Sequence, residues 1–208
     1  MPSTGLAAEP TIGPVKRPVA IRHATPNDAA MLARIGADTF LAAYESQVGA
    51  AILHPYVAEA FTPERLAEEL ADLRGLFLIA QLDGVVAGYA RVTTGDPPAG
   101  VEGDRPIELS RLYAVPTFIG RGIGAALMGA VLDEAGGLGG DVVWLGVWSL
   151  NERAIAFYRR WGFETVGSIA FHLGEAAHED LIMSRRLRDS IDRLARPARM
   201  AVETEGVE

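Results

Sequence analysis

Three closely spaced glycines between an apolar strand and an amphipathic helix constrain this chain more than any other feature. Gly120, Gly122 and Gly124 follow a strand predicted for residues 107–115 and open a helix predicted to run to about Glu134. Glycines leave the backbone N–H groups of a helix start uncovered, and the positive end of the helix dipole adds to their attraction for anions. The turn therefore suits a pyrophosphate, although a tight strand-to-helix turn without any ligand has the same local pattern.

The composition excludes several other kinds of chemistry. The chain of 208 residues contains no cysteine, which excludes disulfides, thiolate metal sites and a thiol nucleophile. Its only lysine is Lys16, so the body of the chain has neither a Schiff-base lysine nor the lysine of a nucleotide-binding phosphate loop. The formal net charge of −8 argues against nucleic-acid binding and is compatible with a cationic small molecule. We also expect no metal site, because the four histidines lack ligand spacing: His23, His54, His172 and His178.

The distribution of residues along the chain predicts one domain between two tails. Residues 1–18, rich in proline and glycine, are expected to form a flexible lead-in, 19–187 a single domain, and 188–208 a C-terminal tail. No basic end joined to an apolar run and no long apolar stretch is found. We therefore expect a cytoplasmic protein without membrane contact, and a homodimer is left open.

Helical and strand patterns alternate between the tails. Asp83-Gly84 separates two apolar runs and predicts an antiparallel hairpin. Two helices are expected before it, with an irregular segment around His54-Pro55 between them. Because helices interleave with strands that are partly linked by hairpins, we expect an α/β fold of the α+β type. Its mixed, mostly antiparallel central sheet would be flanked by helices.

A dinucleotide site is one alternative for the glycine loop. Residues 120–125 fit the loose GxGxxA fingerprint, and Asp141 follows about 20 residues later. That fingerprint requires its acidic residue at the end of the second strand, whereas Asp141 stands at the start of the strand predicted for 141–148. A dinucleotide-binding enzyme is therefore the weaker alternative.

Two ordered motifs give residues 19–187 a resemblance to the GNAT superfamily of acetyl-CoA-dependent N-acetyltransferases. Ala114-Val115-Pro116 and the loop Ile119–Gly124 are similar to the family's [Q/R]xxGx[G/A] motif, with Ile119 in place of Gln or Arg. The second motif, NxxAxxFYxxxGF, is complete from Asn151 to Phe163. Three segments look like the bacterial spermine/spermidine-type group: FLIAQLDGVVAGYARV, VWLGVWSLNERAIAFYRRWGF and FHLGEAAHEDLIM.

The resemblance implies how acetyl-CoA is bound. It implies a GNAT-like sheet in which strands 107–115 and 141–148 splay apart around the cofactor. Strand backbone would bind the pantetheine arm, the glycine loop would bind the pyrophosphate, and an asparagine would contact the cofactor arm. These cofactor-binding residues are Leu112, Tyr113 and Ala114, then Gly120, Arg121, Gly122, Ile123, Gly124 and Ala125, and Asn151.

The resemblance also implies two catalytic side chains. Tyr158 would donate a proton to the thioester sulfur, which suits a phenol with an ordinary pKa of about 10. Glu108 is the candidate base, with a substrate anchor, an ion pair with Arg91 or Arg111, and a water-mediated route left open. Four aromatic residues are candidates to line the acceptor pocket: Phe40, Tyr44, Tyr89 and Trp148.

The sequence therefore predicts acetyl transfer from acetyl-CoA to a primary amine. Because the chain has no cysteine nucleophile, direct attack by the amine in a ternary complex is expected. A polyamine is one candidate acceptor. A non-catalytic acyl-CoA-binding regulatory module has the same cofactor loop and is the alternative from another class.

Overall fold

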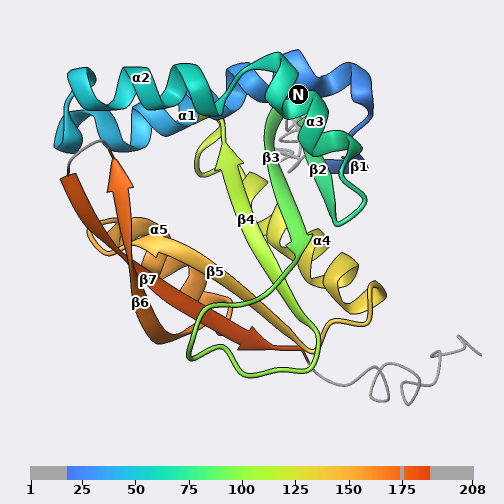
Figure 1. Ribbon diagram of the computed structural model, residues 1–208. Coiled ribbons are helices and arrows are strands. Elements are labelled where there is room, and N and C mark those ends of the chain that lie inside the picture. The colour runs from blue at the N-terminus through green and yellow to red at the C-terminus, as the bar shows by residue number, and fades with distance from the viewer. Residues whose placement is uncertain (1–17, 174–175, 188–208) are drawn as a thin grey trace, which may run out of the picture.

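A seven-stranded sheet organises the chain (Figure 1). The computed structural model describes residues 18–173 and 176–187, so the predicted C-terminal tail and nearly all of the lead-in lie outside the described residues. The strand order is β1-β2-β3-β4-β5-β7-β6, and within the described chain only β4 and β5 are parallel neighbours. This confirms the predicted mixed, mostly antiparallel sheet. The strands are β1 (Ala20–His23), β2 (Gly75–Leu82), β3 (Val85–Thr94), β4 (Pro106–Ala114), β5 (Val142–Trp148), β6 (Glu164–Leu173) and β7 (Ala176–Arg186).

Helices cover both faces of the sheet. Side chains of α1 and α3 form an apolar cluster with β2 and β3, whereas α4 and α5 form another cluster with the opposite face and with β5. Figure 1 shows α1 and α2 running across one end of the strands. Among the described residues, no helix is both long enough and apolar enough to cross a membrane. The helices are α1 (Ala29–Val48), α2 (Ala50–Ala60), α3 (Pro63–Ala71), α4 (Ile123–Gly137) and α5 (Glu152–Arg160), with short 3-10 turns at Pro26–Asp28 and Pro116–Phe118.

The irregular segment expected around His54-Pro55 was wrong, because α2 runs through it. Leu53 and Val57 are both buried and lie one helical turn apart. Pro55 is exposed between them, so its ring meets solvent rather than the core. Burial of this apolar pair outweighs the backbone hydrogen bond that a proline removes from a helix interior.

A β-bulge in β4 decides which of its side chains face the helices α1 to α3. Between the Arg91–Arg111 pair and the Val92–Leu109 pair, β4 carries one extra residue, Ser110. An extra residue reverses the alternation of side chains along a strand. The Leu109 side chain is buried with α4 on one face of the sheet. Arg111, two residues later, therefore lies on the other face, with α3.

The central strands β4 and β5 separate after a short paired stretch. They pair only from Pro106 with Val142 to Glu108 with Trp144, while β5 stays paired with β7 along its whole length. The sheet thus divides into a β1–β4 part and a β5-β7-β6 part that diverge beyond Glu108. This confirms the splay expected between residues 107–115 and 141–148.

Candidate active site

A cavity of about 1110 Å³ lies where β4 and β5 have separated. Its walls come from both strands beyond their last pair, from the start of α4, from one face of α5, and from α1, α2 and β7. The cavity therefore brings together segments from nearly the whole length of the chain. Among its lining residues are most of those predicted from the sequence: Phe40, Tyr44, Leu112, Tyr113, Ala114, Gly120, Gly122, Ile123, Gly124, Ala125, Trp148, Asn151 and Tyr158.

The glycine loop forms the start of α4 at one end of the cavity. Gly120 and Gly122 have φ angles of 83° and 88°, a left-handed conformation that other residues adopt at a cost. Gly122 is the N-cap of α4, so the N–H groups of Ile123, Gly124 and Ala125 have no partner within the helix. Backbone donors and the positive helix end thus face the cavity, an arrangement suited to a phosphate group.

Arg121 lies in the same loop but is not among the described residues that line the cavity. Its guanidinium lies 5.4 Å from the centre of the Phe118 ring, and the side chain is exposed. Gly120 and Gly122 on either side of it line the cavity, whereas Arg121 does not.

The position of Asp141 removes the dinucleotide alternative. Its carboxylate accepts hydrogen bonds from the backbone N–H groups of Asp104 and Arg105, at 2.7 and 3.0 Å. These hydrogen bonds lower the pKa of Asp141. Because β4 and β5 are parallel, this carboxylate before β5 lies at the opposite end from the glycine loop after β4. Asp141 is thus a structural residue that holds the loop leading into β4.

Tyr158 reaches the cavity from α5. The residue is 9% exposed, and its ring packs against Phe157 and Phe163 with centroid distances of 5.5 and 5.9 Å. Burial, with a smaller contribution from Tyr44, raises the pKa of the Tyr158 phenol. A phenol with a raised pKa stays protonated at neutral pH and can act as a hydrogen-bond or proton donor.

Asn151 has a structural role in addition to its place on the cavity wall. It is the N-cap of α5, and its Oδ1 accepts a hydrogen bond from the Ala154 N–H at 3.1 Å. Its side chain also hydrogen-bonds to Tyr44, which opposes the increase that burial causes in the pKa of the Tyr44 phenol. Asn151 therefore fixes the start of α5 at the cavity wall.

Glu108 lies where β4 and β5 begin to separate, just outside the cavity. It belongs to the last paired position, opposite Trp144, and the Thr93 hydroxyl donates a hydrogen bond to its Oε2 at 3.1 Å. The following residue, Leu109, lines the cavity, but Glu108 is not among the described lining residues. This arrangement favours an intervening water molecule over direct contact between Glu108 and a group in the cavity.

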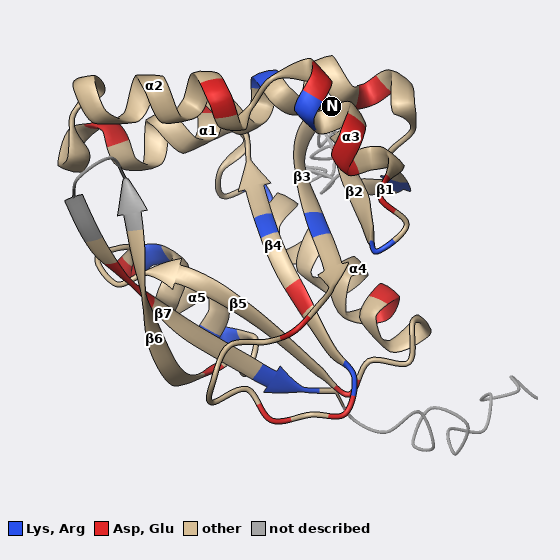
Figure 2. Cartoon of the chain, viewed as in Figure 1, with Lys and Arg blue, Asp and Glu red and all other residues tan. Residues whose placement is uncertain are grey.

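The ion pair that the sequence left open for Glu108 is formed instead by Glu69 of α3. Both Glu69 oxygens accept hydrogen bonds from Arg111, and Oε2 lies 3.5 Å from Nε of Arg91. Figure 2 shows the basic segments of β3 and β4 beside the acidic residues of α3. Arg91 and Arg111, two of the four arginines among the described lining residues, therefore already have a common countercharge.

One of the four aromatic residues predicted to line the acceptor pocket does not line the cavity. Tyr89 is fully buried between Phe77 and Tyr113, with ring-centroid distances of 6.0 and 5.3 Å, and it does not line the cavity. The expectation that Tyr89 lines the acceptor pocket was therefore wrong. Alternation along β3 explains this, because its side chain points beneath α1 and α3, into their apolar cluster with the sheet.

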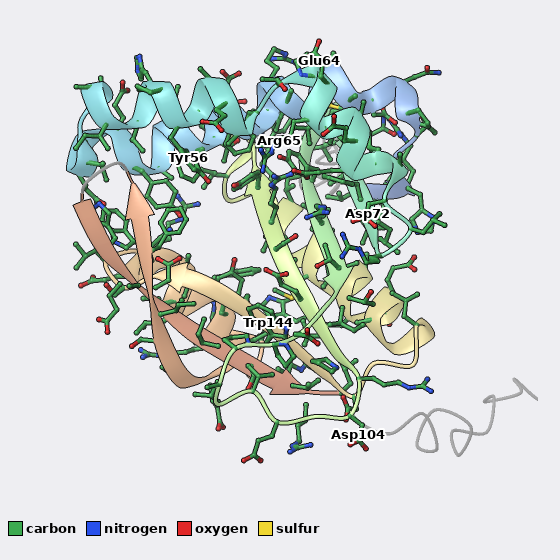
Figure 3. The ribbon with its side chains drawn as sticks, in the orientation of Figure 1. Tyr56, Glu64, Arg65, Asp72, Asp104 and Trp144 are labelled. Atoms are coloured by element: carbon green, nitrogen blue, oxygen red, sulfur yellow. The ribbon has the colours of Figure 1, made fainter. Side chains whose placement is uncertain are left out.

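Among the cavity residues that sequence reasoning missed, five come from the region of α2 and from the β6–β7 hairpin. They are contributed by α2, by the end of that helix, and by the β6–β7 hairpin, which lies beside α1 and α2 in Figure 1. In Figure 3 the Tyr56 side chain points from α2 toward this hairpin. Alternation in the second hairpin strand offered a signal, because residues two apart share a face. The five are Tyr56, Phe61, Phe171, His178 and Asp180.

A mixed sheet whose parallel central strands separate beside a glycine-rich helix start is typical of the GNAT fold. The model of the acetyltransferase (GNAT) family matches residues 38–163, and the chain belongs to this family. It is accordingly an acetyl-CoA-dependent N-acetyltransferase.

Relatives and solved structures agree with this assignment. An uncharacterized N-acetyltransferase of Mycobacterium tuberculosis is 39% identical over 160 residues, covering 77% of this chain and 98% of the relative. The N-alpha-acetyltransferase RimI of the same species is 33% identical over 105 residues, covering 50% of this chain and 62% of RimI. The PaiA N-acetyltransferase of Thermoplasma acidophilum, solved with coenzyme A, has the same fold. It is 21% identical with a TM-score of 0.65, over 81% of this chain and 99% of that one.

Proposed function

We propose that this enzyme transfers the acetyl group directly to a primary amine in a ternary complex, with Tyr158 as proton donor and Glu108 as base. The observation that carries the proposal is the buried Tyr158 phenol on the wall of a cavity that begins at the separation of β4 and β5. The chain has no cysteine to form a covalent acyl-enzyme through a thiol. Direct attack needs no nucleophile from the protein.

The cavity has the donors that acetyl-CoA requires. The uncovered N–H groups at the start of α4 suit the pyrophosphate, and a Cβ added at Gly120 or Gly122 would meet no atom within 4 Å, so space is open there. The unpaired edge of β4 from Leu112 to Ala114 offers backbone groups to the amides of the pantetheine arm. The solved neighbours PaiA, with coenzyme A, and YncA of Salmonella typhimurium, with acetyl-CoA, support this cofactor.

Two protons have to move during the reaction. Bound acetyl-CoA supplies an acetyl group activated as a thioester. The amine arrives as an ammonium ion and loses one proton to Glu108 through a water molecule before its nitrogen bonds to the carbonyl carbon. Its second proton leaves as the amide forms and replaces the one that Tyr158 gives up. The departing sulfur takes a proton from Tyr158, whose raised pKa keeps it protonated until then. Glu108 thus acts on the amine nitrogen and Tyr158 on the departing sulfur.

Initial-rate kinetics test this proposal. With acetyl-CoA and a panel of amines that includes spermidine, putrescine, a monoamine and a peptide with a free N-terminus, thiol release should depend on the amine. Mass spectrometry should show an N-acetylated product, and double-reciprocal plots should intersect. Stabilisation of the protein by CoA without any product would instead identify a non-catalytic acyl-CoA-binding module. Spermidine and putrescine test the polyamine suggested by the sequence.

A Gly120→Ala variant tests the glycine loop. Because alanine at φ 83° costs about 1–2 kcal/mol, the loop should shift, and we expect KM for acetyl-CoA to rise roughly tenfold with little change in KM for the amine. Gly129→Ala is the matched control, since this helical glycine of α4 also has open space around it and lacks the positive φ. Equal KM values for acetyl-CoA in the two variants would contradict a phosphate-binding role for the loop.

A further inference from the structure

The acceptor half of the cavity has a chemistry of its own, formed by aromatic rings and one carboxylate. We infer that it selects a primary amine with a single positive charge and an aromatic or similarly large apolar group, with Asp180 holding the ammonium. This inference rests on the proposed transfer to a primary amine and specifies its acceptor.

Aromatic rings form a continuous wall between α1, α2 and the β6–β7 hairpin. The Phe40 centroid lies 4.7 Å from Tyr44, 5.2 Å from Tyr56 and 5.7 Å from Phe61. The wall continues from Tyr44 to Trp148 at 5.3 Å and from Tyr56 to Phe171 at 6.1 Å. All six residues line the cavity. Such a wall favours an apolar or aromatic group by burial, and ring faces also attract a cation.

Asp180 lies beside this wall on β7. It pairs with Trp148 across the strands, and it is the only acidic side chain among the described residues that line the cavity. Burial raises the pKa of Asp180, and the nearby His178 opposes this increase. Asp180 forms no salt bridge within the described part of the chain, so the cavity has a carboxylate for one ammonium group.

The charges of the other lining residues narrow the acceptor further. Arg111 and Arg91 share Glu69 as their countercharge, so they offer little to an anionic acceptor. Arg153 and Arg160 extend from α5, the helix that also bears Tyr158, and Arg160 lies over the Phe157 ring. A polyamine would bring further ammonium groups against aromatic rings, where only Asp180 can pair with them, and burying an unpaired charge is costly.

A comparison of four amines tests the inference on the full-length protein. We expect kcat/KM for 2-phenylethylamine to exceed that for n-propylamine by about 10- to 100-fold, because the ring gains burial against the wall. For spermidine, kcat/KM should be lower than for 2-phenylethylamine, because the cavity has no second carboxylate among its described lining residues to pair with the additional ammonium groups. For phenylalanine, kcat/KM should be lower than for 2-phenylethylamine by about tenfold or more, because the carboxylate of phenylalanine would approach the carboxylate of Asp180 and be repelled by it.

Two variants, each with a matched control, test the roles of Asp180 and of the aromatic wall and distinguish them from effects of a substitution on the fold. Asp180→Asn should raise KM for 2-phenylethylamine about tenfold and leave KM for acetyl-CoA unchanged, as expected for a charged hydrogen bond. Glu179→Gln is the matched control, an exposed neighbour on the opposite face of the same strand. Tyr56→Ala should reduce the preference for 2-phenylethylamine over n-propylamine, whereas Glu59→Ala, exposed on the same helix, should not.

Calorimetry with the CoA-saturated protein separates this inference from the proposed function. Tighter binding of 2-phenylethylamine than of spermidine, lost in Asp180→Asn, supports the inference even if no amine is acetylated, an outcome that would overturn the proposed transfer. Acetylation with spermidine or n-propylamine as the best substrate would overturn the inference and leave the transfer intact. An Asp180→Asn variant that behaves like Glu179→Gln would also overturn it.

Discussion

A Tyr158→Phe variant is expected to lose about 100- to 10,000-fold in kcat, the usual range for removal of a positioned proton donor. The change deletes one oxygen and retains the ring that packs against Phe157 and Phe163. KM for acetyl-CoA and for the amine should therefore change little. Steady-state rates of thiol release at saturating acetyl-CoA measure the effect.

The physical reason is that the phenol can supply its proton only at the moment when the thiolate departs. Burial keeps Tyr158 protonated above the pH at which an exposed tyrosine ionises, so the activity of the wild-type enzyme should not decline between about pH 8 and pH 10 through loss of this proton. A decline of kcat in that range that disappears in Tyr158→Phe would show that the phenol ionises near its ordinary pKa.

Tyr89→Phe is the control for Tyr158→Phe. Tyr89 is also a buried tyrosine, but the structure has it outside the cavity, with a hydroxyl that lacks a hydrogen-bond partner. Removal of an unsatisfied buried hydroxyl should leave kcat unchanged and stability the same or slightly higher. Equal losses of kcat in both variants would assign the effect to core packing and remove Tyr158 from the mechanism.

Local chemistry explains why so much of the fold was predictable from the sequence. The Asp83-Gly84 turn specifies the β2–β3 hairpin, and Thr62-Pro63 specifies the start of α3 through an N-cap that accepts the Arg65 N–H at 3.1 Å. The glycine loop is equally local, because positive φ at its glycines depends on the residues themselves. The helix α2 was missed, and an irregular segment predicted around His54-Pro55 instead, because the proline signal competed with tertiary burial of Leu53 and Val57.

The acceptor half of the cavity was less predictable, because it is assembled from strands and helices distant in the chain. Asp180 and Trp148 become neighbours only through the β5–β7 pairing, and no spacing in the sequence reports which strands pair. The bulge at Ser110 likewise changes which side chains become neighbours, and no sequence pattern predicted it. Simple alternation along β4 would put Arg111 on the face of Leu109, whereas the bulge turns it toward Glu69.

Glu108→Gln is expected to lower kcat/KM at pH 7 by about 100-fold or more, the usual range for loss of a general base. The substitution keeps the size of the side chain and an oxygen that can accept from the Thr93 hydroxyl, so the fold should be retained.

The loss in Glu108→Gln should shrink as the pH rises toward the pKa of the amine. Each unit of increase in pH in that range gives about tenfold more unprotonated amine, which no longer needs a base to remove its proton. A plot of log kcat/KM against pH from 6 to 10 measures this.

Glu164→Gln, at an exposed glutamate at the start of β6, is the control with the same change of charge. A loss that stays constant over this pH range would exclude Glu108 from deprotonation of the amine. The Thr93→Val variant adds a second criterion, since removal of the hydroxyl that orients Glu108 should give a smaller loss with the same dependence on pH.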